Sequence, residues 1–134
     1  MNIVEFPPPL QAFNCSCQGD FTERINAFSR GQAKSIYLRN LQDWYPDAEF
    51  TDIRASKADT LADAGVSGVA KYRNVPFVKV GMAVRVGKQL GRIDSAGYGG
   101  AWFHYVAPDG HSGVFHPQGD PVVWFNEDGS EVEP

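Results

Sequence analysis

Glycine is concentrated in the second half of this chain, and apolar residues recur at every second position between the glycines. Ten of the fourteen glycines fall at or after Gly81. From Val78 to Val86 every second residue is apolar, which is the period of a strand with one buried face. A Pro-Asp-Gly tripeptide at 108–110 is a strong turn signal. The pattern predicts that residues 77–134 form a small β-barrel of short strands, ending in an acidic C-terminal tail.

The first half of the chain shows the mixed pattern of a small sheet and one helix. Alternating apolar residues in 13–17 and 21–27 flank the turn residues Gly19 and Asp20, which predicts an antiparallel hairpin. Ser29 is expected to cap a helix, because the residues after it show apolar positions at helical spacing. The buried stripe of that helix would consist of Ala33, Ile36, Tyr37, Leu41 and Trp44.

A third strand is expected within 48–56, which completes a strand-strand-helix-strand (ββαβ) unit over residues 1–57. Residues 58–76 are expected to form a linker with a short helix, stopped by Gly65 and Gly68. A length of 134 residues fits one domain or two small modules of this kind. The predicted fold class is therefore α+β, with an N-terminal ββαβ unit followed by a small C-terminal β-barrel.

Composition and charge narrow the range of partners. Hydrophobic residues make up 43% and charged residues 21%, as in globular proteins, so a folded protein is expected. The net charge of −4 disfavours general attraction to phosphate backbones. No apolar run reaches the roughly 20 residues that span a bilayer, and the first residues lack the pattern of a secretory signal. We therefore expect a cytoplasmic protein that does not enter membranes.

Cys15 and Cys17 are the only cysteines of the chain. In an extended segment, residues i and i+2 lie about 7 Å apart, which is a poor geometry for a disulfide. They are expected to be buried thiols on one face of a strand. The alternative is half of a zinc site completed by two histidines, although the spacing of zinc ligands is absent. The available histidines are His104, His111 and His116.

Residues 81–93 have the spacing G-x-x-V-x-V-G-x-x-x-G-x-I, which resembles the opening hairpin of SH3-like barrels of the KOW and CAP-Gly types. The CAP-Gly ligand motif GKNDG is absent, so the resemblance implies a fold and no ligand. Across the chain, the order of the SRGQAK helix, the YPDAEFTDIRAS segment, the KYRNVPFVKV segment and His116-Pro117 is similar to small uncharacterised bacteriophage and prophage proteins. That resemblance implies a viral origin and a location in the host cytoplasm.

Signatures of catalysis are missing from the sequence. No Ser, Cys or His lies in a local nucleophile motif such as G-x-S-x-G. The glycines at 97, 99 and 100 lead into an expected strand and not into a helix, so they do not form a phosphate-binding loop. We therefore expect a protein that is not an enzyme and needs no cofactor.

Aromatic residues of the expected barrel are the first candidates for a binding site. Trp102, His104 and Val106 share one face of a strand, and Phe103 and Tyr105 share the other. The strand is either buried between two layers or exposes aromatic residues to a partner. The predicted site combines such anchors with nearby cations, and it consists of Tyr98, Trp102, Tyr105, Trp124, Arg85, Lys88 and Arg92.

The leading hypothesis is noncatalytic binding to a host or phage protein complex, with inhibition of host machinery as one form. The alternative is nucleic-acid binding, in which Lys79 and the cations of the site contact phosphates while rings stack on bases. Four cations are few compared with the six to ten phosphates that duplex binders typically neutralise. A third hypothesis, mimicry of a phosphate backbone by carboxylates, lacks an acidic face outside residues 126–134.

Overall fold

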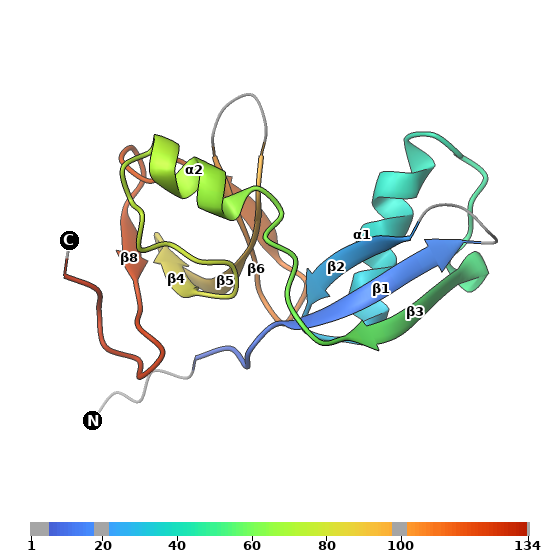
Figure 1. Ribbon diagram of the computed structural model, residues 1–134, viewed down its shortest axis with the longest axis horizontal. Coiled ribbons are helices and arrows are strands. Elements are labelled where there is room, and N and C mark those ends of the chain that lie inside the picture. The colour runs from blue at the N-terminus through green and yellow to red at the C-terminus, as the bar shows by residue number, and fades with distance from the viewer. Residues whose placement is uncertain (1–5, 18–21, 98–101, 134) are drawn as a thin grey trace. The chain divides into compact units, whose positions relative to one another are not determined.

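The computed structural model describes residues 6–17, 22–97 and 102–133 and divides the chain into two compact units. Residues Leu10–Ala62 form one, called here the three-stranded unit. Met1–Pro9 and Asp63–Pro134 form the other, called the five-stranded unit (Figure 1). This division differs from the predicted ranges, because residues 63–76 belong to the five-stranded unit and are not a separate linker. The fold class is α+β, with two small antiparallel sheets and two α-helices among the described residues.

The three-stranded unit consists of an antiparallel sheet and one helix. Its strands β1 (Gln11–Cys17), β2 (Glu23–Ala27) and β3 (Ile53–Ala58) follow the order β2-β1-β3. Helix α1 (Arg30–Gln42) follows β2, and the 3₁₀ helix η1 (Phe50–Asp52) precedes β3. The predicted pairing of the first two strands and the predicted cap are confirmed, because Ser29 Oγ accepts the Gln32 N–H at 3.1 Å. The turn predicted at Gly19 and Asp20 lies outside the described residues.

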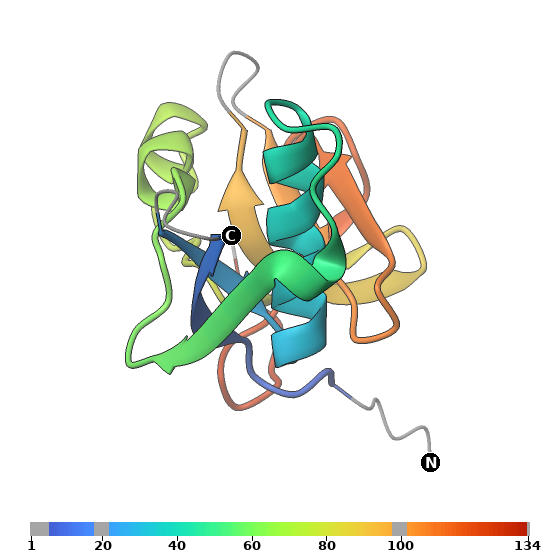
Figure 2. The same cartoon turned by 90° about the vertical axis from the view of Figure 1, so that its right-hand side faces the viewer.

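Helix α1 covers one face of this sheet (Figure 1, Figure 2). Its residues Ala33, Tyr37 and Leu41 are buried, as the helical spacing predicts. They pack against side chains that share one face of the strands: Phe13, Cys15, Cys17, Ile25, Ala27 and Ile53. The prediction was wrong for Trp44, which lies beyond the end of the helix and is 78% exposed.

The opposite face of the sheet is contacted by the segment that follows β3. Asn26 is the buried polar residue of β2, with an exposed fraction of 4%. Its Nδ2 donates to Ala62 O at 2.8 Å, and its Oδ1 accepts the Ala62 N–H at 2.9 Å. One amide side chain thus satisfies both backbone groups of a residue that belongs to no strand.

Replacing Asn26 with alanine should therefore leave two backbone groups without partners in a buried place. We expect a loss of about 2 kcal/mol in the free energy of unfolding, measured by urea titration. Asn14 is a matched control, because it lies on the same face of the sheet opposite Arg24 and is only half-buried. Asn14→Ala should cost less than about 0.5 kcal/mol. Equal losses in the two variants would show that the pairing with Ala62 does not stabilise the unit.

The five-stranded unit contains helix α2 (Val66–Tyr72) and strands β4 (Ala83–Val86), β5 (Gln89–Ala96), β6 (Phe103–Val106), β7 (Ser112–Phe115) and β8 (Val122–Trp124). The sheet order is β7-β6-β5-β4-β8, and all its pairs are antiparallel. The strand expected over residues 78–86 is shorter than predicted, because residues 75–82 form two turns and β4 begins only at Ala83. The sheet is not closed in the part of the chain that the structure describes, because β7 and β8 form its two edges.

Helix α2 starts later than the short helix predicted within 58–65. The prediction was wrong because Gly68 was taken as a stop, whereas it lies inside α2 on an exposed face. Gly65 precedes the helix with a positive φ of 84°, a conformation that glycine adopts without strain. Val66, Val69 and Ala70 are buried, so the spacing i, i+3, i+4 fixes the position of the helix on the core.

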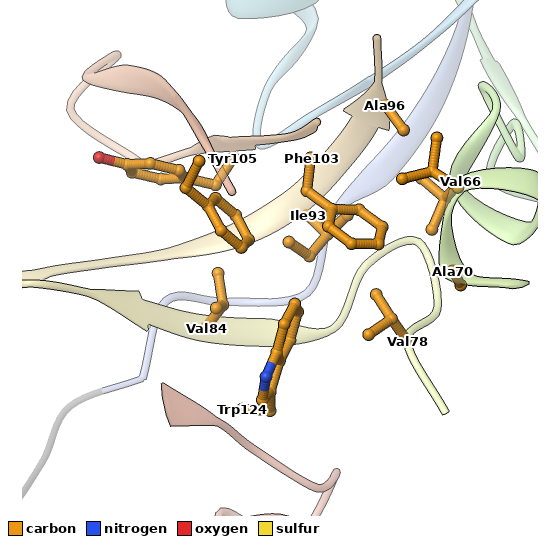
Figure 3. Close-up of a cluster of buried hydrophobic side chains, with 11 residues drawn as sticks. Val66, Ala70, Val78, Val84, Ile93, Ala96, Phe103, Tyr105 and Trp124 are labelled. Atoms are coloured by element: carbon orange, nitrogen blue, oxygen red, sulfur yellow. The ribbon is translucent and has the colours of Figure 1, made fainter. Parts of the chain in front are cut away.

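The core of the five-stranded unit consists largely of aromatic and β-branched side chains (Figure 3). Phe103 and Phe115 have no exposed surface, and Trp124 lies within 5.8 Å of both rings. The expectation that Tyr105 and Trp124 are exposed anchors was wrong, because they are only 7% and 8% exposed. The physical reason is the register of the sheet, which places Phe103 and Tyr105 on the face that packs against Trp124 and Ile93.

The acidic segment 126–134 was predicted to be a tail, but its described residues fold back on the unit. Asn126 N–H donates to Ser130 O and closes a turn, in which Gly129 has a positive φ. Val132 N–H then donates to Trp124 O at 2.9 Å, and the Val132 side chain packs against the core. Two hydrogen bonds from Ser130 hold the pKa of Asp128 below its usual value.

Candidate functional site

The structure separates the predicted site residues instead of gathering them. Trp102 is 39% exposed at the start of β6, whereas Tyr105 and Trp124 are in the core. Tyr98 lies outside the described residues, so nothing is concluded about it. Of the four predicted aromatic anchors, Trp102 is the one that the described structure places at the surface.

The predicted cations also differ from one another. Lys88 is exposed in the turn between β4 and β5. Arg85 is half-buried, with its guanidinium 5.8 Å from the centre of the Phe125 ring. Arg92 is half-buried and donates to backbone carbonyl oxygens, and its burial lowers its pKa. An arginine engaged in this way is a poor candidate for phosphate contacts, and the exposed cations of the predicted basic patch are Lys79 and Lys88.

Trp102 belongs to a small surface on the outer face of β6 and β7. Its ring meets the His116 ring edge-on at 5.1 Å, and Val114, which pairs with His104 in the register, is 57% exposed. His116 Nδ1 accepts the backbone N–H groups of Gln118 and Gly119 at 3.1 and 3.0 Å. This pattern places the imidazole proton on Nε2 and fixes the orientation of the ring.

A second set of exposed rings lies on the segment that runs from the end of α1 to the first residue of η1. Trp44 is 78%, Tyr45 51% and Phe50 42% exposed, and we call residues 43–50 the aromatic loop. The apolar spacing of Trp44 predicted a buried position on the helix, so these exposed rings were not expected. Tyr45-Pro46-Asp47 does indicate the end of the helix, since the residue before a proline disfavours the helical conformation, but it does not indicate which rings are exposed.

Hydrogen bonds close the aromatic loop. Tyr45 N–H donates to Leu41 O at 2.8 Å, and Ala48 N–H donates to Tyr45 O at 3.0 Å. Gln42 Nε2 reaches across the loop to Ala48 O at 3.1 Å. The ring of Phe50 receives Lys34 Nζ at 5.5 Å from its centre. Two large rings are therefore presented to solvent on a loop that the rest of the unit keeps in shape.

The charges around the aromatic loop are mainly negative. Asp43, Asp47 and Glu49 are exposed between or beside its rings, and Asp52 follows at the end of η1. Glu49 N–H donates to the Asp52 carboxylate at 3.2 Å, which fixes the start of η1. The loop therefore presents aromatic rings within a mainly negative surface.

The cysteines offer little chemistry. Neither cysteine forms a disulfide and both are buried in the three-stranded unit, whereas the three histidines belong to the five-stranded unit. Burial, with a smaller contribution from Glu23 and an opposing one from Lys34, raises the pKa of Cys15 to about 11. A thiol with that pKa stays protonated at neutral pH, so it is a weak nucleophile and a poor metal ligand. Within 6–17, 22–97 and 102–133, no group of three or more His, Cys, Asp or Glu side chains gathers as a metal site would require.

His104 is the other titratable group of interest on the outer face of the five-stranded sheet. Its burial lowers its pKa, so the imidazole is neutral at pH 7. Its Nε2 lies only 2.9 Å from where a side chain at Gly97 would begin, so the imidazole packs against the backbone at this glycine.

Two further findings bear on identity. The described helices are too short and too polar for any of them to span a membrane. Comparison with protein-family models, with curated proteins and with solved structures finds no match to this chain.

Proposed function

We propose that this chain is a noncatalytic binding protein whose aromatic loop docks on a partner protein. The observation that supports this most is the exposure of Trp44 at 78% and of Tyr45 at 51% on a loop closed by hydrogen bonds. Tryptophan and tyrosine are the residue types that dominate interface energies, because they bury large apolar areas while losing little conformational freedom. A loop already held in shape adds to this, since binding then costs less ordering entropy.

The charges of the loop favour a protein partner over nucleic acid. Asp43, Asp47 and Glu49 would repel phosphate groups brought close to Trp44. In the five-stranded unit, Arg85 and Arg92 already engage a ring and backbone carbonyls. The partner that fits best is a protein surface with an apolar pocket rimmed by lysine or arginine. The nucleic-acid alternative then depends on Lys79 and Lys88 alone.

The finer description of the fold is also a proposal. We propose that the three-stranded unit is a ββαβ unit and that the five-stranded unit is an SH3-like barrel that is partly open. Consecutive strands β4 to β7 pair in order and β8 returns beside β4, which is compatible with a sheet that curls. The irregular register between Ile93 and Ser95 in β5 supports such curvature. A bacteriophage origin, a host or virion complex as partner, inhibition of host machinery and a location in the host cytoplasm depend on the sequence resemblance and stay predictions.

The binding proposal is tested by comparing two equally exposed rings. The partner is first captured from bacterial lysate and identified by mass spectrometry, and its affinity for each purified variant is then measured by calorimetry. Trp44→Ala should weaken binding about 30-fold or more, as expected for a central aromatic anchor. Tyr72→Ala is the matched control, because Tyr72 is 75% exposed at the end of α2 in the other unit, and it should change the affinity less than threefold.

Two results would contradict the proposal. One is equal loss, or no loss, of partner binding in Trp44→Ala and Tyr72→Ala. The other is retardation of labelled nucleic acid at moderate salt that disappears when Lys79 and Lys88 are replaced by alanine. The second result would favour the nucleic-acid alternative.

A further inference from the structure

The guanidinium of Arg92 binds the backbone of a proline-rich segment far away in the sequence. Nε donates to Pro7 O at 3.2 Å and to Pro8 O at 2.8 Å, and Nη2 donates to Pro7 O at 2.8 Å. Nη1 donates to Gly81 O at 2.8 Å, which fixes the orientation of the group on the sheet. Arg92 thus contacts two consecutive carbonyl groups of an extended segment, independently of the side chains there.

Phe6 supplies the side-chain contact of the same segment. Its ring meets the Phe125 ring edge-on at 5.0 Å, and Pro7 is buried. A side chain at Gly129 would begin only 3.0 Å from Phe6 Cε2, so the glycine leaves the space that the ring occupies. Arg85 lies over Phe125 as well, 5.8 Å from its centre. The surface therefore combines a place for one aromatic ring with donors for the two carbonyl groups that follow it.

These contacts match the chemistry of a proline-rich peptide. Proline has no N–H group, so such a peptide offers only carbonyl oxygens and cannot join a sheet by a regular ladder. A guanidinium supplies several donors and no acceptor, which is the complement of that pattern. Consecutive prolines also favour an extended conformation before binding, which lowers the entropy cost of binding.

The segment is attached to its unit through side-chain contacts and not through a backbone ladder. Among the backbone–backbone hydrogen bonds between described residues, none joins residues 6–9 to β4, β5 or β8. Its removal would leave every strand pair of the five-stranded sheet intact. Segments outside the backbone ladder open at a lower free-energy cost than the core strands.

We propose that the surface formed by Arg92, Phe125, Gly129 and Gly81 is a binding site for extended peptides in which an aromatic residue precedes two prolines, and that residues 6–8 occupy it as an internal ligand. A partner peptide binds when it displaces this segment. The affinity for the partner is therefore reduced by the fraction of molecules in which the internal segment is bound. The site lies in a different unit from the aromatic loop, so it is independent of the proposed docking through Trp44.

The test measures binding of a fluorescent synthetic peptide with the sequence of residues 5–10 to the full chain by fluorescence polarisation. Phe6→Ala in the protein weakens the internal ligand and leaves the surface unchanged, so we expect it to bind the peptide about tenfold more tightly than the wild-type chain. A peptide in which alanine replaces the phenylalanine should bind the Phe6→Ala chain at least tenfold less tightly than the parent peptide. This peptide control does not alter the protein.

The contribution of Arg92 is tested in the Phe6→Ala background. Arg92→Lys keeps the charge but loses the geometry that serves two carbonyl groups, and it should reduce peptide affinity at least fivefold with an unchanged circular dichroism spectrum. The proposal is overturned if the wild-type and Phe6→Ala chains bind the parent peptide equally. Equal binding of the parent and alanine peptides, or no binding up to 1 mM peptide, overturns it as well.

Discussion

Replacing Gly91 with alanine is expected to lower the free energy of unfolding of the five-stranded unit by about 3 kcal/mol. A methyl group at this position of β5 would lie 2.7 Å from Val106 O and 3.0 Å from Tyr105 Cδ2. The first atom belongs to the backbone of the neighbouring strand β6, which cannot move without breaking its pairs with β5 and β7. A rotamer change therefore cannot relieve the strain. We expect the loss in the free energy of unfolding to lie near the upper end of the range for overpacked cores.

Thermal unfolding followed by circular dichroism measures this effect. A loss of about 3 kcal/mol in a unit of this size corresponds to a decrease in Tm of roughly 12 °C or more. Gly68 is the matched control, because a methyl group there would meet nothing within 4 Å. Gly68→Ala should raise the stability by about 0.5–1 kcal/mol, since alanine favours the helical conformation of α2. A Tm for Gly91→Ala equal to that of the wild type would show that β5 and β6 are further apart than described.

The same strand region shows why the exposed residues could not be predicted from the sequence. Tyr105 lies beside two glycines from different strands, since a methyl group at Gly113 would be 2.8 Å from its ring. Gly113 is its partner in β7, and Gly91 belongs to β5. The period-two pattern located the strands, but it does not state which face is covered. That information depends on the pairing of segments distant in the sequence.

Local signals were predicted well where one residue determines the outcome. Ser29 caps α1 as expected, because the cap depends only on Ser29 and the amide three residues later. Trp44 shows the limit of such reasoning. Its position continues the helical spacing of the apolar residues, but the helix ends at Gln42. Arg92 shows another limit, because its carbonyl partners are 84 and 85 residues away. No local pattern indicates that a strand cation will bind Pro7 and Pro8.

Replacing Trp124 with alanine is expected to have the largest effect of any aromatic substitution at the originally predicted site. The ring of Trp124 lies 5.6 to 5.8 Å from the centres of Phe77, Phe103 and Phe115 and is 8% exposed. Its removal leaves a cavity beside Phe103 of β6 and Phe115 of β7, which the paired strands hold in place, so the surroundings cannot collapse fully. We expect the free energy of unfolding to decrease by about 3–5 kcal/mol.

Comparison with Trp44→Ala distinguishes a core ring from an interface ring. Trp44 is 78% exposed, so its replacement should change the free energy of unfolding by less than about 0.5 kcal/mol. Urea titration measures the free energy of unfolding of both variants, and calorimetry measures the affinity of each variant for the partner. If Trp124→Ala kept wild-type stability but no longer bound the partner, Trp124 would be an exposed anchor. Its assignment to the buried aromatic core would then be wrong. The expected result is that Trp124→Ala is destabilised, whereas Trp44→Ala is stable but no longer binds the partner. This result would show that Trp124 packs the core and that Trp44 recognises the partner, because only a solvent-exposed ring can contribute to binding without contributing to folding.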